Sequence, residues 1–373
     1  MSTLNINLSA IARNWQRLND FCAGAECGAV VKADAYGLGV KPVARSLWQQ
    51  GCRHFFIASV AEGRELRKTL PEAKIYVLGG VLPGEERECL SLAMLPVLVS
   101  LEMVRRWSEL CPRAPSVLKL DTGMGRLGLD EEELDAFLQQ PSQLKRAGVV
   151  LVMSHTACAD QAEHPLNRAQ LDAFVAARKR LLQIDASLKF SFANSAAILL
   201  GSEYHFDMVR PGIALFGSNA FIRSPLRFET VVQLLLTIVR LRFINKPCQL
   251  GYGATYNAQP GQLIAAASGG YADGLLRSLG NRGQAWLYNK PVPICGRLSM
   301  DGALFDVSAC SAELEHLSEA EWPELELLGS QQSIDDLALA AGTVAYEILT
   351  SLGVRYQRNY QVLDPLSGDN DAG

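Results

Sequence analysis

A repeated alternation of sequence patterns constrains the fold of this chain more than any other feature. Short apolar runs alternate with helix-like segments about eight times within the first roughly 220 residues, close to the length of a (β/α)8 barrel. Val149–His155 is typical of a strand buried on both faces, and Pro165–Leu182 is typical of a helix. A doubly wound open sheet is the alternative, but no GxGxxG motif opens the chain. We therefore predict an N-terminal barrel over residues 9–220.

The sequence changes character beyond Val231. Helical periods fade, and short strand-like stretches separated by Gly, Pro and Asn take over, as in Gln233–Phe243 and Gly302–Val307. We predict a mostly β domain formed by residues 1–8 and 226–365, with a loose tail over residues 366–373. The predicted fold class is thus α/β, a TIM-like barrel followed by a mostly β domain.

Composition excludes several classes of protein. The 373 residues are 49% hydrophobic and 20% charged, which indicates globular domains with large cores. The net charge of −4 comes without basic runs, so we expect no nucleic-acid partner, and the apolar stretches are too short for a membrane span. Nine cysteines without a CxxC pair, and no visible signal segment, favour a reducing cytoplasm. Five histidines lack HxH or HxxxH spacing, so we expect no metal site.

Polar residues stand at or just after the predicted barrel strands, at the end where such barrels keep their chemistry. They are Lys32, Arg126, His155, Ser195 and Arg210. Burial at a strand end favours the neutral, nucleophilic form of a lysine amine, which can form a Schiff base with a carbonyl substrate or with pyridoxal phosphate. Taken alone, a snorkelling lysine that merely ends a strand is the commoner explanation for Lys32.

The loops after the seventh and eighth strands of such barrels frequently bind phosphate. Here Ser195 offers a hydroxyl, and Gly212 allows the backbone to approach an anion, although a helix cap and a turn would explain both residues equally well. Arg210 requires a partner, either Asp207 in an ion pair or a heterocyclic nitrogen of a ligand. Because arginine does not surrender its proton, such a nitrogen would stay largely unprotonated.

Seven segments, in order along most of the chain, resemble the motifs of the alanine racemase family. They are Val31–Gly37, Leu120–Gly128, Ala193–Ala196, Val209–Ile213, Gly251–Tyr256, Gly270–Gly274 and Gly296–Asp301. The resemblance implies a homodimeric, pyridoxal-phosphate-dependent racemase that interconverts L- and D-alanine. It implies that Lys32 would hold the cofactor covalently and act as one base, and that Tyr252 of the partner subunit would act as the base on the opposite face.

The resemblance also implies roles for other residues. Arg126 would orient the cofactor and the substrate carboxylate, and a hydrogen-bonded relay of His155 and Arg210 would support Tyr252. The residues implied to hold the phosphate are Tyr36, Ser195, Gly212 and Ile213. Leu78 and Asn194 are implied to line the cofactor pocket. Met300 is implied to contact the substrate, and Tyr271 and Asp301 are implied to narrow the entrance. Lys119 would be carbamylated, the alternative being an ordinary ammonium beside Asp121.

Three positions depart from the family pattern. Leu38 replaces a common histidine, Gly302 replaces a larger residue, and Thr350 is the best match to a tyrosine that reaches the phosphate in some members. A racemase of another small amino acid such as serine is the nearest alternative. A barrel-type amino-acid decarboxylase is disfavoured by Tyr252 and Met300, and a non-catalytic cofactor-binding protein by the second domain. Cell-wall supply and alanine catabolism both stay open as roles.

Overall fold

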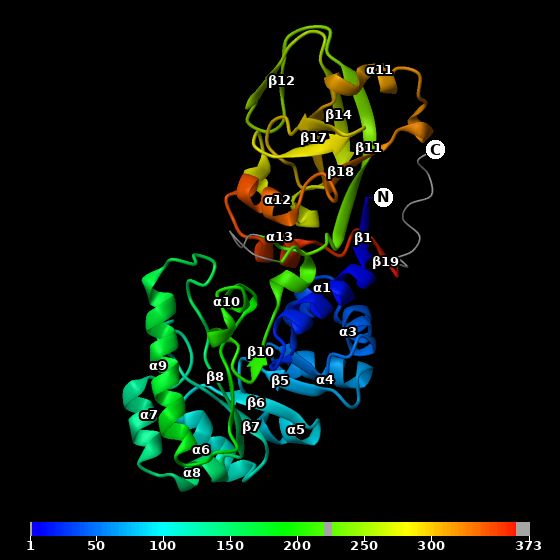
Figure 1. Cartoon of the computed structure of the whole chain (residues 1–373). Helices are drawn as coiled ribbons and strands as arrows, with labels where there is room; N and C mark the ends of the chain where they lie inside the picture. The colour runs from blue at the N-terminus through cyan, green and yellow to red at the C-terminus, as the bar shows by residue number, and fades with distance from the viewer. Residues whose placement is uncertain (1, 220–225, 363–373) are drawn as a thin grey trace.

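The computed structural model describes residues 2–219 and 226–362. The predicted tail and the predicted domain limits at residues 220 and 365 therefore lie outside the described residues. The chain forms a lower part of alternating strands and helices and an upper part made mostly of strands (Figure 1). This arrangement confirms the predicted fold class.

The lower part is a closed parallel barrel with strand order β2-β10-β9-β8-β7-β6-β5-β4-β3. Its strands are β2 (Glu26–Cys27), β3 (Ala29–Val30), β4 (His54–Ile57), β5 (Lys74–Val77), β6 (Met94–Leu98), β7 (Ser116–Lys119), β8 (Val149–Met153), β9 (Lys189–Ser191) and β10 (Met208–Val209). β2 and β3 are two pieces of one segment interrupted at Gly28; β2 pairs with β10 and β3 pairs with β4. Gly28 donates to the Val209 carbonyl at 3.0 Å, and Val31 donates to Phe56 at 2.9 Å. The ring of the predicted (β/α)8 barrel is thereby closed.

Helices cover the outside of the barrel. They are α1 (Leu8–Phe21), α3 (Val40–Gln49), α4 (Val60–Thr69), α5 (Glu86–Ser91), α6 (Leu101–Leu110), α7 (Glu131–Leu138), α8 (Ser142–Arg146) and α9 (Pro165–Leu182), with the short α10 (Ser195–Ile198) at the mouth. Local sequence sets several of their starts: Ser59, Ser100 and Asp130 each accept a hydrogen bond from the amide three residues on. Inward-facing aromatic rings then pack these helices against the barrel strands. For example, the fully buried Phe174 of α9 stacks on Phe192, with ring centroids 4.9 Å apart.

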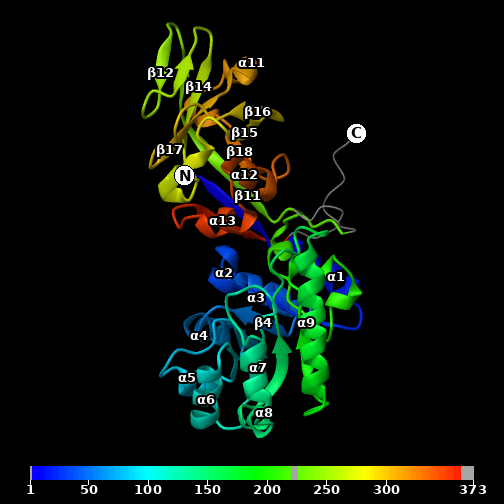
Figure 2. The ribbon, with the colours of Figure 1, turned by 90° about the vertical axis from the view of Figure 1, so that its left-hand side faces the viewer.

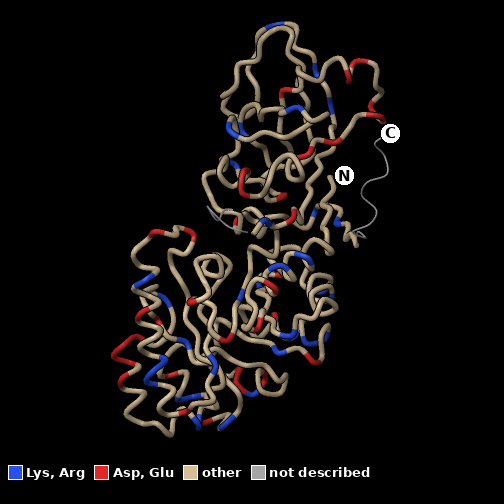
Figure 3. The backbone as a smooth tube through the Cα atoms, viewed as in Figure 1, with Lys and Arg blue, Asp and Glu red and all other residues tan. Residues whose placement is uncertain are grey.

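The upper part is organised around one long strand, β11 (Val232–Phe243). It pairs with β1 (Thr3–Asn7), β18 (Glu324–Leu328) and β14 (Leu263–Ser268), so the first strand of the chain lies in this domain. The other strands are β12 (Cys248–Leu250), β13 (Tyr256–Ala258), β15 (Gln284–Leu287), β16 (Lys290–Pro293), β17 (Gly302–Asp306) and β19 (Gln357–Gln361). The helices are α11 (Ser311–Leu314), α12 (Ile334–Ala341) and α13 (Ala345–Ser351); α13 lies between these strands and the barrel mouth (Figure 2). Acidic and basic residues are interspersed over both parts (Figure 3).

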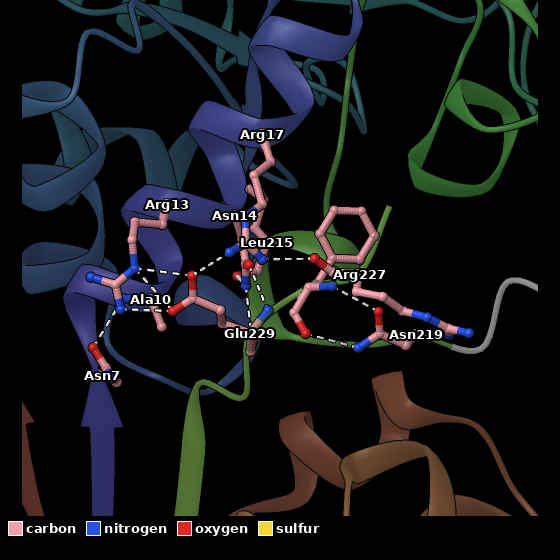
Figure 4. A network of polar contacts seen from close by, with 10 residues as sticks. Asn7, Ala10, Arg13, Asn14, Arg17, Leu215, Asn219, Arg227 and Glu229 are labelled. Atoms are coloured by element: carbon pink, nitrogen blue, oxygen red, sulfur yellow. Dashed lines mark hydrogen bonds and ion pairs between the residues drawn. The ribbon is translucent and has the colours of Figure 1, made fainter. Parts of the chain in front are cut away.

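A polar network fastens the segment that enters β11 to the first barrel helix (Figure 4). Asn14 of α1 donates to the carbonyls of Leu215 and Glu229 at 3.2 and 3.0 Å and accepts from the Glu229 amide at 2.7 Å. The Glu229 carboxylate binds Arg13 at 2.7 Å and Arg17 at 2.8 Å. Because Asn14 is fully buried and uses both ends of its amide, this contact fixes where the chain leaves the barrel.

Candidate active site

The carboxyl ends of the barrel strands surround a cavity of about 320 Å³. Its lining gathers the residues expected to bind the cofactor: Lys32, Tyr36, Leu78, Arg126, His155, Asn194, Ser195, Arg210, Gly212 and Ile213. Lys119, the lysine expected to be carbamylated, lines the same cavity. The cavity is also lined by Tyr346 of α13, which comes from the other domain of the same chain. This is the face on which barrels of this kind carry their chemistry.

Lys32 opens a short left-handed turn, α2 (Lys32–Tyr36). The four residues after Lys32 all have φ between 53° and 56°, a backbone region that costs non-glycine residues energy. Asp34 stabilises the turn by accepting from the Val40 amide at 2.7 Å, and Gly37 ends it with a φ of 81°. Both Lys32 and Tyr36 line the cavity, so the strained turn presents an amine and a phenol to the same space.

One end of the cavity is suited to a phosphate. The Ser195 hydroxyl accepts from the amides of Gly212 at 2.8 Å and Ala214 at 3.3 Å, which leaves its own proton to donate. A Cβ on Gly212 would lie 2.4 Å from the Tyr36 hydroxyl oxygen, so only glycine admits that hydroxyl here. Ser195 also begins α10, and the first amides of a helix have no acceptor within it. Hydroxyls and free amides together form an anion cradle.

Tyr346 is the residue of α13 that reaches this cradle. Its ring lies 5.9 Å from that of Tyr36, measured between centroids. Thr350, the expected equivalent of a phosphate-binding tyrosine, instead donates its hydroxyl to the Tyr346 carbonyl at 2.8 Å and faces solvent. The two residues lie one helical turn apart, so sequence spacing alone did not separate them. The expected match to Thr350 was wrong, and Tyr346 was missed.

Arg210 is buried at the floor of the cavity. Its guanidinium donates to the Ser191 hydroxyl, to the Ser154 carbonyl at 2.6 Å and to the Phe192 carbonyl at 3.3 Å. Asp207 is not its partner, because that carboxylate accepts from the Phe190 amide at 2.7 Å. Without a carboxylate, burial lowers the pKa of Arg210 to about 10, and the residue still carries its charge at neutral pH.

His155 stays uncharged beside this arginine. Burial, and after it the nearby charges of Arg210 and Lys119, together lower its pKa to about 3. Among the described residues the Arg210 guanidinium bonds Ser191, Ser154 and Phe192, and the relay expected between His155 and Arg210 stays a prediction. The interaction between the two residues is electrostatic.

Arg126 stands on a loop that one carboxylate organises. Asp121 accepts from the Arg126 amide at 2.8 Å and from the amides of Gly123 and Met124 at 2.9 and 2.8 Å. Although burial opposes it, these hydrogen bonds keep the pKa of Asp121 below its usual value. The Asp121 carboxylate therefore binds the backbone of the loop, and the Arg126 side chain lines the cavity.

The cavity as a whole is cationic. Burial, then the charge of Arg126, lowers the pKa of Lys32, whereas Glu62 opposes the shift. Burial, then Arg210 and Arg126, lowers the pKa of Lys119 to about 8. Both amines therefore have an enlarged neutral fraction. A carbonyl-bearing ligand with an anionic phosphate fits these residues, because a nucleophilic amine and an anion cradle line one space.

The remaining predicted residues lie elsewhere. Tyr252, which follows β12, is 70% exposed and lines a second, open cavity of about 480 Å³ together with Arg297 and Asp301. This cavity shares no lining residue with the first. Tyr271 and Met300 are likewise about half exposed, and Asp301 accepts from Arg355 at 2.8 Å. Within one chain, Tyr252 and Lys32 are not brought together.

Residues 2–219 and 226–362 contain neither a candidate metal site nor a candidate membrane span. No group of His, Cys, Asp or Glu is arranged to hold a metal ion. None of the helices in these ranges is long and apolar enough to cross a bilayer.

A closed barrel with a desolvated lysine facing a phosphate cradle, joined to a mostly β domain, defines a class of pyridoxal-phosphate enzymes. Family models for the alanine racemase N-terminal and C-terminal domains match residues 6–220 and 231–360. The chain belongs to the alanine racemase family.

Individual relatives cover nearly the whole chain. Alanine racemase of Rhodospirillum rubrum is 45% identical, covering 96% of this chain and 95% of its own. Agrobacterium fabrum has a catabolic alanine racemase at 40% identity (96% and 91%) and a biosynthetic one at 38% (97% and 94%). The crystal structure of Bartonella henselae alanine racemase with covalently bound pyridoxal phosphate superposes with a TM-score of 0.89 at 36% identity, covering 96% and 99% of the two chains.

Proposed function

We propose that this protein interconverts L- and D-alanine with pyridoxal phosphate as its cofactor. The single observation that carries the proposal is the juxtaposition of Lys32 with the cradle of Tyr36, Ser195 and Gly212 in one cationic cavity. The nearly full-length likeness to alanine racemases supports the reaction. Relatives with catabolic and with biosynthetic names match about equally well, so both roles stay compatible with the chain.

When bound, the cofactor withdraws electrons from the α-carbon of the amino acid and so acidifies the α-proton. Lys32 would hold it covalently and would serve as the base on one face of the substrate, since burial enlarges the neutral fraction of its amine. Tyr36, Ser195, Gly212, Ile213 and Tyr346 would hold the phosphate, and Leu78 and Asn194, which line the same cavity, would contact the cofactor. Arg210, which keeps its proton, would be the residue toward a ring nitrogen of the bound cofactor and would leave that nitrogen largely unprotonated.

The second base is Tyr252 of the partner subunit in a homodimer. Inverting a stereocentre without rotating the substrate requires a base on each face, and the barrel cavity supplies Lys32 on one. Tyr252 is exposed on a separate cavity, which is the arrangement expected of a surface that a second chain covers. Arg126 and Met300 bind the substrate carboxylate, and Tyr271 and Asp301 narrow the entrance.

We also propose a domain organisation and a cellular location for this chain. We expect the barrel to span residues 9–220 and the β-rich domain to comprise residues 1–8 and 226–365; within the described residues, the pairing of β1 with β11 supports this division. All nine cysteines are free, which suits a reducing cytoplasm.

Chiral chromatography of a substrate panel tests the function. L-alanine should become racemic, and serine should react roughly 10- to 200-fold more slowly, because one small group in a pocket gives only that discrimination. Release of carbon dioxide would indicate a decarboxylase, and an unchanged substrate would indicate a binding protein. Faster turnover of lysine or arginine than of alanine would refute alanine as the proposed substrate.

A further inference from the structure

Glu62, the third residue of α4, makes two hydrogen bonds that the proposed chemistry does not use. One carboxylate oxygen accepts from the Ala33 amide at 3.0 Å, and the other accepts from the Ala58 amide at 2.7 Å. Ala33 is the first left-handed residue after Lys32, and Ala58 follows β4 and lines the active-site cavity. A single side chain therefore bridges the strained turn and the barrel wall.

We propose that Glu62 is a positioning residue whose carboxylate holds the left-handed turn, and with it Lys32 and Tyr36, against the end of β4. The turn needs such support, because each non-glycine residue in this conformation is disfavoured roughly 5- to 30-fold. Four consecutive residues, Ala33 to Tyr36, carry that penalty. Hydrogen bonds to a carboxylate are about twice as strong as neutral ones, so this contact can offset a substantial part of it.

Glu62 also influences the Lys32 amine through its charge. It raises the pKa of Lys32, against the larger lowering by burial and by Arg126. A purely electrostatic role toward the amine is thus the competing explanation. The two roles differ in one respect: only the first depends on the backbone conformation of the turn.

The variant Glu62→Gln, studied alone and together with Ala33→Gly, distinguishes the two roles. A glutamine has one acceptor oxygen, which we expect to keep the shorter, local bond to Ala58 at 2.7 Å, so the bond to Ala33 is lost. In the full-length holoenzyme we expect amide hydrogen exchange at Ala33 to accelerate roughly tenfold, and the dissociation constant for pyridoxal phosphate to rise by a similar factor. Glu65→Gln is the matched control, since Glu65 lies on the same helix but pairs with Lys68 on the surface.

Ala33→Gly supplies the decisive comparison. Glycine adopts the left-handed region without penalty, and the Ala33 side chain is exposed, so little packing is lost. Added to Glu62→Gln, it should restore most of the lost cofactor affinity, by roughly fivefold. Affinity that stays low in the double variant would overturn the proposal in favour of the electrostatic role, as would unchanged exchange at Ala33 in Glu62→Gln. The inference rests on the proposed cofactor role of Lys32, whose failure would appear separately, as no binding by the unaltered chain.

Discussion

Lys32 is the residue on which the proposed chemistry depends. Its amine sits between Arg126, which lowers its pKa, and Glu62, which raises it, while burial dominates both. The purified protein should be yellow and should lose its visible absorption band on treatment with borohydride. Lys32→Ala should abolish both the bleachable band and racemisation, whereas Lys68→Ala on the exposed face of α4 should keep them. A Lys32→Ala variant with full activity and an intact adduct would falsify the assignment.

Lys119 is predicted to be carbamylated. Its side chain is buried, and burial with Arg210 and Arg126 lowers its pKa to about 8, so a neutral amine that can capture carbon dioxide is accessible near physiological pH. The product is an anion suited to orienting Arg126. Protein exposed to ¹³C-labelled bicarbonate should show a carbamate carbon signal that Lys119→Gln removes.

The carbamylation of Lys119 should also depend on pH. Because only the neutral amine reacts, the carbamate signal should weaken as the pH falls below about 8. Lys145, on the short surface helix α8, provides a control position. A signal that survives in Lys119→Gln, or electron density that ends at the Lys119 Nζ, would contradict the prediction.

At the scale of elements, a buried ion pair joins α5 to α6. Glu86 is 1% exposed and accepts from Arg106 at 2.7 Å and from the Gly84 amide at 2.8 Å. Glu86→Ala leaves the Arg106 guanidinium partly buried without its carboxylate, which should cost about 3 kcal/mol of unfolding free energy. Denaturant titration measures this cost. Glu88→Ala, which removes an exposed pair with Arg64, should cost less than about 1 kcal/mol.

The pair also predicts an acid dependence. Burial raises the pKa of Glu86, but Arg106 and backbone amides lower it more, so its folded pKa lies below the ordinary value of 4.5. Its stabilisation is therefore present above pH 4.5 and is lost as the pH falls through the lower, folded pKa. The stability difference between the unaltered chain and Glu86→Ala should shrink on acidification below that value, and a constant difference would argue against the pair.

At the scale of the whole molecule, the separation of Lys32 from Tyr252 predicts complementation between subunits. Lys32→Ala and Tyr252→Phe homodimers should each be nearly inactive. After subunit exchange, a heterodimer contains one site that lacks both bases and one that is intact, because the proposed interface is isologous. An equal, random mixture should thus recover roughly a quarter of the unaltered activity.

This experiment has two informative failures. Verified exchange without recovery would mean that both bases come from one chain. Full activity of a strictly monomeric unaltered protein would mean the same. Mixing each variant with itself is the control for the exchange procedure.

Sequence determined the features that depend on local periodicity and capping. Pro165–Leu182 was predicted and is α9 with the same limits, because a proline suits the first turn and the apolar spacing runs unbroken to the end. Short or charged strands such as β18 (Glu324–Leu328) and β19 (Gln357–Gln361) were missed, because neighbouring strands rather than their own pattern select the extended conformation. Strand ends also predicted which barrel residues meet in the cavity, since parallel strands of a barrel deliver their carboxyl ends to one face.

Tertiary structure alone decided which partners those residues have. Arg210 is held by a hydroxyl and two carbonyls rather than by Asp207, and Tyr346 rather than Thr350 reaches Tyr36. The contact of Glu62 with the Ala33 amide could not be found from the sequence, because the two residues are 29 positions apart and only the folded barrel brings them together. Periodicity specifies the face on which a side chain lies. Which atoms it meets there depends on packing between segments distant in the chain, and that information exists only in the folded molecule.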